Sequence, residues 1–175
     1  MKTIDKKAEL KKEQKVQIEN WTNLKMKDIV FDSNIHNWEE YESEFNDLIL
    51  NKQNLIFLIE IEHNIKFGGF ISSKIDKYHW ISDENAFLFT FKDNNPMKFD
   101  IEKDDEDTAF YLCEKSHGYL FEIGYLDIDI FKQNYKSTIY QDDNSSSFDY
   151  QGNEKALIGK TGGFSPKRIL VIQIK

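Results

Sequence analysis

Residues 55–91, LIFLIEIEHNIKFGGFISSKIDKYHWISDENAFLFTF, contain three apolar segments separated by polar turns. Leu55–Ile61 is a run of apolar, largely β-branched residues, which is typical of a buried strand. After a short turn, Lys66–Ile75 predicts a second strand that completes a hairpin with the first. Ala86–Phe91 predicts a third strand, which ends at a cluster of turn-forming residues. The stretch therefore predicts neighbouring antiparallel strands.

The second of these segments contains the pair Gly68-Gly69. Glycine inside a strand weakens it, and therefore marks a bulge, a bend or a close approach of backbone. The flanking residues, Phe67 and Phe70, are large and aromatic. We interpret the segment as a bent strand whose aromatic side chains pack in the core.

The rest of the chain repeats the pattern of short strands and turns. Further strands are predicted at Thr108–Cys113, Tyr119–Ile123, Leu126–Ile130 and Ile169–Ile174. In Leu126–Ile130 the apolar residues share one face, so Asp127 and Asp129 are predicted to point to solvent on the other. About eight short strands, without alternating helices, predict a mainly β (α+β) fold, a two-sheet antiparallel β-sandwich.

Two helices are predicted beside the sheets. Residues 1–20 are rich in Lys and Glu with sparse apolar residues, and predict a solvated leader helix ahead of a single domain at residues 21–175. A second helix is predicted over residues 38–50, because one helical face collects Trp38, Tyr41, Phe45, Leu48 and Ile49. Asn37 and Glu40 form a capping-box-like pattern at its start.

Composition limits the class of protein. The 175 residues include 14% aromatic residues, enough for a folded core. The net charge is −8, and residues 21–175 carry 17 basic against 27 acidic side chains, so nucleic acid is not an expected ligand. The lone cysteine, Cys113, excludes an intrachain disulfide. Neither a signal peptide nor ~18 consecutive apolar residues occur, so we expect a cytoplasmic protein without membrane insertion.

No complete catalytic or metal-binding pattern is present. Gly159-Lys160-Thr161 resembles the end of a P-loop, but Glu154 occupies the position of its first glycine. Cys113 and His117 are too few to bind zinc, and Cys113 is expected to be a small buried residue. The acidic segments 100–107 and 142–149 are interpreted as solvated loops, with a weak cation site left open. We therefore predict no catalytic residue, no cofactor and no metal.

Several short motifs, taken in order, resemble those of the TLDc domain, the module of the eukaryotic oxidation-resistance proteins. Asp28–Ser33 resembles its opening strand and turn, and Ile169–Ile172 resembles its closing strand. Other matching positions, interpreted as structural, are Phe67, Gly68, Gly69, Phe70, Phe87, Phe89, Gly124 and Gly159. The chain departs from the family in lacking a Gly-Gly pair near Gly124, and in having Lys167-Arg168 where the family has an acidic residue.

The resemblance implies a sandwich with flanking helices that binds other proteins and has no active site of its own. Members of the family protect cells against oxidative stress, and several bind the vacuolar proton-pumping ATPase, so its subunits are expected partners. Two alternatives stay open: a thiol-dependent antioxidant enzyme using Cys113, and a signalling adaptor that oligomerises through residues 1–20. The oligomeric state is not predicted.

Overall fold

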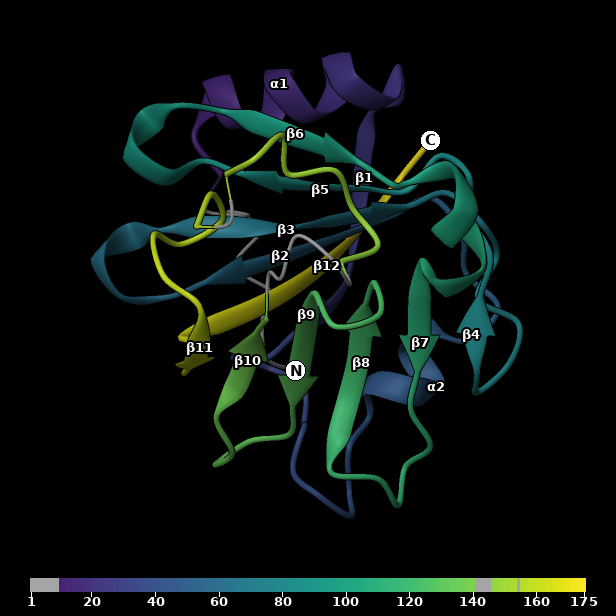
Figure 1. The fold of residues 1–175 in the computed structure, drawn as a ribbon. Coiled ribbons are helices and arrows are strands. Elements are labelled where there is room, and N and C mark those ends of the chain that lie inside the picture. The colour runs from purple at the N-terminus through teal and green to yellow at the C-terminus, as the bar shows by residue number, and fades with distance from the viewer. Residues whose placement is uncertain (1–9, 141–145, 154) are drawn as a thin grey trace.

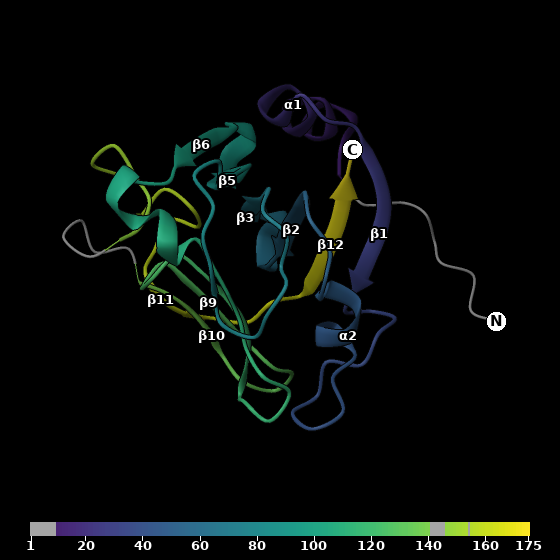
Figure 2. The same cartoon turned by 90° about the vertical axis from the view of Figure 1, so that its right-hand side faces the viewer.

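The structure is a computed structural model, and it describes residues 10–140, 146–153 and 155–175. Within these residues the chain forms two six-stranded antiparallel sheets that face one another (Figures 1 and 2). In spatial order, sheet A contains β1 (Met26–Asp32), β12 (Arg168–Ile174), β2 (Leu55–Glu60), β3 (Lys66–Ile71), β5 (Phe87–Thr90) and β6 (Met97–Asp100). Sheet B contains β11 (Gly162–Phe164), β10 (Ser137–Ile139), β9 (Ile128–Phe131), β8 (Tyr119–Ile123), β7 (Phe110–Leu112) and β4 (Trp80–Ile81). The predicted β-sandwich is confirmed.

Short 3-10 helices join some of the strands. They are η1 (Glu62–Asn64) between β2 and β3, η2 (Lys92–Asn94) between β5 and β6, and η3 (Lys103–Thr108) between β6 and β7. None of the helices in the described ranges is long and apolar enough to cross a membrane.

The hairpin of β2 and β3 forms the centre of sheet A, and every residue of both strands is buried. Gly68-Gly69 forms no bulge, because β3 pairs with β2 in unbroken register from Lys66 to Ile71. The glycines serve close packing instead. A Cβ atom on Gly68 would lie 1.7 Å from the carbonyl oxygen of Phe57, and one on Gly69 would lie 3.1 Å from Cδ1 of Ile123 in the facing sheet.

Aromatic side chains fill the space between the sheets. Phe57 of sheet A packs on Phe110 and Phe121 of sheet B, with ring centroids 4.8 and 5.0 Å apart. Phe45, from helix α2 (Phe45–Ile49), stacks on Phe121 at 5.2 Å and meets Phe31 edge-on at 4.9 Å. Such pairs add to the free energy of burying the rings. Helix α2 therefore closes the end of the core beside β1 (Figure 2).

The predicted helix over residues 38–50 is wrong in its first half. The side-chain oxygen of Asn37 accepts a hydrogen bond from the amide of Glu39, which forms a local turn in place of a helix cap. Glu44 in turn accepts from the amide of Asn37, and Tyr41 is 77% exposed. The apolar spacing of this segment therefore reflects a folded loop followed by the five residues of α2.

Helix α1 (Lys12–Thr22) covers the face of sheet A that points away from sheet B (Figures 1 and 2). Ile18 is fully buried, and the ring of Trp21 lies 6.0 Å from those of Phe87 and Phe91. The helix extends two residues beyond the predicted limit of the leader, and one of its sides is buried instead of solvated. A large apolar side chain buried in this way contributes about 1.5–3 kcal/mol.

Candidate functional site

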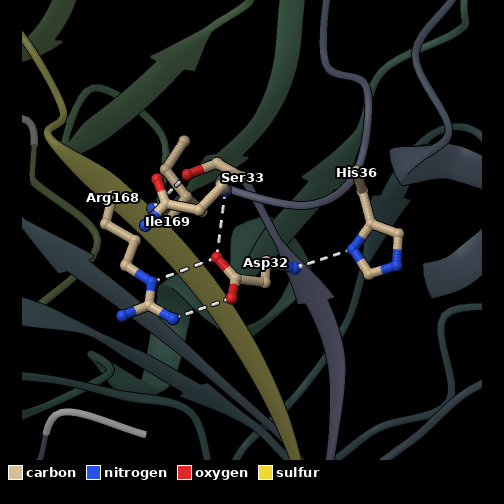
Figure 3. Close-up of polar contacts among 6 residues, drawn as sticks. Asp32, Ser33, His36, Arg168 and Ile169 are labelled. Carbon is tan, nitrogen blue, oxygen red and sulfur yellow. Dashed lines mark hydrogen bonds and ion pairs between the residues drawn. The ribbon is translucent and has the colours of Figure 1, made fainter. Parts of the chain in front are cut away.

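An ion pair links the first and last strands of the chain (Figure 3). Arg168, at the start of β12, donates two hydrogen bonds to the carboxylate of Asp32, at the end of β1, over 3.0 and 2.7 Å. Asp32 is 1% exposed. Burial, the largest single influence, raises the pKa of Asp32, but the hydrogen bonds from Arg168 and the amide of Asn34, together with the charges of Arg168 and His36, outweigh it and keep that pKa below its usual value. The Arg168 that departs from the family pattern thus binds a carboxylate of its own chain.

Asp32, Ser33 and His36 supply the residue types of a catalytic triad within one turn. Their bonds do not form a relay (Figure 3). Nδ1 of His36 accepts from the amide of Asp32, the hydroxyl of Ser33 accepts from the amide of Ile169, and the carboxylate accepts from Arg168. A triad requires the imidazole to bond the hydroxyl and the carboxylate. The arrangement instead joins β1 to β12.

Cys113 follows β7 and is 1% exposed. Burial raises the pKa of its thiol far above the ordinary range, and the charges of Glu122 and Asp129 act in the same direction. A reactive cysteine requires the opposite, an accessible sulfur with a depressed pKa. No group of three or more potential metal-ligating side chains occurs in the part of the chain that the structure describes.

The eight positions that carry the family resemblance do not form one site. Phe70, Phe87 and Phe89 gather beneath helix α1. Phe67 points into the core between the sheets. Gly124 and Gly159 lie in turns with φ angles of 72° and 84°, which glycine adopts without strain. Together with the glycines of β3, these residues build the fold.

Lys132 is a buried charge that the sequence did not single out. Its ammonium group donates to the backbone carbonyl of Glu40 over 2.6 Å and to that of Lys115. Burial lowers its pKa, and the side chain is 0% exposed. Lys132 therefore fastens two loops to the end of β9.

Asp127 is not at the predicted solvent-facing position. It lies in the turn before β9, is 0% exposed, and accepts hydrogen bonds from the hydroxyl of Tyr150 and the amide of Ser147 over 2.7 and 2.8 Å. Burial raises its pKa to about 7. The carboxylate thus anchors the segment after the polar loop. The residues 141–145 of that loop, and with them part of the predicted cation segment 142–149, lie outside the described residues.

The outer face of sheet B, which points away from sheet A, is the candidate docking surface. No described helix or strand lies over it (Figures 1 and 2). Successive cross-strand partners place one row of residues across all six strands of this face: Trp80, Tyr111, Glu122, Asp129, Thr138 and Gly163. We call this set the outer row. The adjacent row, which includes Phe110, Ile123 and Ile128, points into the core.

Two carboxylates occupy the centre of the outer row. Glu122 and Asp129 are direct partners on β8 and β9. Burial raises the pKa of Glu122 to about 7, with a further contribution from the charge of Asp129, and burial raises that of Asp129 to about 6. Asp129 is only 6% exposed, so the prediction of a fully wet face is wrong for it as well.

Aromatic side chains surround these carboxylates. Tyr111 is the direct partner of Glu122 and meets Trp80 edge-on at 5.1 Å. The hydroxyl of Tyr140 bonds Asp129, and its side chain is 40% exposed. Tyr125, 53% exposed, contacts Trp80 at the rim. Tyrosine and tryptophan are the residues that most often dominate protein–protein interfaces, so this face has the composition of a docking surface.

Comparison with protein-family models identifies the family to which the chain belongs. The model of the TLDc domain matches residues 11–169. No curated protein matches the chain. The family match begins within one residue of α1 and ends within β12, so it spans both sheets and the helix that covers sheet A. The chain belongs to the TLDc domain family.

Proposed function

We propose that this TLDc domain is a non-enzymatic protein-interaction module that docks partners on the outer face of sheet B. The observation that carries the proposal is the contrast between the two outer faces. Helix α1 covers that of sheet A through Ile18 and Trp21, whereas the outer row of sheet B presents Trp80 and Tyr111 beside two carboxylates. Trp80 and Tyr111 are half-buried, and the exposed Tyr125 and Tyr140 lie beside them; aromatic residues grouped in this way indicate an interaction site.

The finer role follows from the family resemblance. We propose that the domain acts in the cytoplasm of a eukaryotic cell, in protection against oxidative stress or in regulation of the vacuolar proton-pumping ATPase, whose subunits are the proposed partners. The geometry of Asp32, Ser33 and His36 and the burial of Cys113 support a role without catalysis.

A pull-down from an extract of the protein's own cells tests this proposal. The native chain should recover pump subunits, identified by mass spectrometry. The double variant Tyr125→Ser/Tyr140→Ser, at the rim of the candidate surface, should lose them, because it removes two exposed aromatic anchors. The matched control Tyr41→Ser/Tyr135→Ser removes two exposed tyrosines elsewhere and should retain them. Equal recovery by both variants would exclude this face as the docking surface.

The thiol-enzyme alternative has its own test. A buried, protonated Cys113 should resist alkylation in the folded chain and react after unfolding. Rapid alkylation under native conditions would favour the enzyme over the interaction module. The adaptor alternative predicts oligomers that depend on residues 1–20, which light scattering of the whole chain would detect.

A further inference from the structure

The two carboxylates of the outer row lack a cation. Glu122 and Asp129 are directly opposed, and like charges at opposed positions destabilise an antiparallel pair of strands. Neither forms an ion pair with any residue that the structure describes. The nearby Lys132 directs its ammonium group to the carbonyls of Glu40 and Lys115 instead. A cation supplied from outside would relieve this unfavourable arrangement.

The surroundings of the pair favour a planar cation. Tyr111 flanks Glu122 across the strands, and the hydroxyl of Tyr140 bonds Asp129. On the same face, the ring of Tyr119 packs on that of Phe131, with the ring centroids 4.0 Å apart. Aromatic faces beside carboxylates suit guanidinium, which stacks on rings and donates paired hydrogen bonds.

We propose that the outer face of sheet B binds an arginine, carried on a basic segment of a partner protein, with the guanidinium group between Glu122 and Asp129. This inference rests on the proposed function and names the chemistry of the partner. Charge complementarity supports it, because residues 21–175 have 27 acidic against 17 basic side chains. Arginine fits better than lysine, since guanidinium is less strongly hydrated and presents a fork of donors to two carboxylates.

A short capped peptide whose only charges are two arginine side chains, acetyl-Gly-Arg-Gly-Arg-Gly-amide, is a suitable probe. Added at millimolar concentration to the full chain labelled with ¹⁵N, it should shift the backbone amides of β7, β8, β9 and β10. The same peptide with citrulline in place of arginine keeps the shape and loses the charge, and should cause no such shifts. Equal shifts with citrulline, or shifts confined to other parts of the chain, would overturn the inference.

Matched variants separate this site from the general acidity of the surface. Glu122→Gln/Asp129→Asn should weaken binding of the arginine peptide at least about tenfold, because the charge-assisted bonds are lost. Glu102→Gln/Asp104→Asn removes the same charge from an exposed segment and should change it little. If both double variants weakened peptide binding equally, the binding would depend only on the net charge of the protein, which would contradict a specific site.

Thr138→Arg offers a test that does not depend on removing either carboxylate. Thr138 is the direct partner of Asp129, so an arginine there would place a guanidinium group within the chain itself beside the pair. This variant should raise the melting temperature and stop binding of the probe. If the native chain does not bind the probe while Tyr125→Ser/Tyr140→Ser still loses the pump subunits, the inference fails and the proposed function stands.

Discussion

At the scale of single residues, buried charged side chains connect segments that lie far apart in the sequence. The ion pair of Asp32 and Arg168 joins strands from opposite ends of the chain, and Lys132 fastens two loops. The outer row holds the two carboxylates that lack a cation. A charge removed from water is costly unless it is paired. The ion pair and Lys132 stabilise the fold, whereas the two carboxylates of the outer row are the ones that we propose bind a cation of a partner.

Arg168→Met should destabilise the domain by about 3–5 kcal/mol, because it leaves the carboxylate of Asp32 buried without its guanidinium partner. Urea denaturation followed by fluorescence would measure the loss. Asp32→Asn/Arg168→Met should recover part of it, since Asp32 no longer leaves a buried carboxylate without its guanidinium partner. A loss below about 1 kcal/mol for the single variant would show that the pair is not held as the structure has it.

Glu122→Gln should change how stability depends on pH. The native pKa of Glu122, about 7, lies above its ordinary value of 4.5, so between these limits the folded state binds more protons and the stability of the native chain falls as pH rises. The variant should be more stable than the native chain at pH 8 by about 1 kcal/mol, a value reduced for partial exposure, and equal to it near pH 4. Thermal melts across this range would measure both, with Glu102→Gln as the control. A gap that does not close at low pH would contradict the account.

At the scale of elements, the sequence predicted the longer apolar strands and missed β4, β6, β10 and β11. The strands at β2, β3, β5 and β12 are continuous apolar runs, because they lie inside a sheet covered on both faces. β4, β10 and β11 have two or three residues each and follow no period. Their pairing is set by tertiary contacts that a local pattern does not contain.

The candidate site escaped prediction for a related reason. Alternation along Leu126–Ile130 placed Asp127 and Asp129 in solvent, because it could not show that Asp127 lies in a turn where Ser147 and Tyr150 cover it. Nor could it place Glu122 opposite Asp129, because that depends on the register of β8 and β9. The ion pair of Asp32 with Arg168 joins residues 136 positions apart. The periodicity of apolar residues shows which side chains share a face of a strand. Only the folded structure shows which residues pack against that face.

Trp21→Ala should detach helix α1 from sheet A. The indole contacts Phe87, Phe89 and Phe91, so its removal should cost about 3 kcal/mol or more. Hydrogen exchange of the α1 amides should accelerate more than that of β2, because the helix loses its main anchor. Val16→Ala, at a side chain that is 45% exposed, is the control and should change little. Unchanged protection of α1 in the tryptophan variant would show that the helix does not depend on this contact.

At the scale of the whole molecule, the sandwich has two unlike outer faces. One is closed by a helix of the same chain (Figure 2), and the other holds aromatic residues around two carboxylates. The TLDc family match spans both sheets. The aromatic residues and carboxylates on the outer face of sheet B are the basis of the function proposed above.

A photo-cross-linking residue at position 138, in the chain expressed in its own cells, tests this claim most directly. Thr138 lies in the outer row next to Asp129, and the exposed Lys27 on β1 of the other sheet is the matched control position. We expect a partner protein to be cross-linked from position 138 and not from position 27. No adduct from position 138, or the same adduct from both positions, would contradict a docking surface on sheet B.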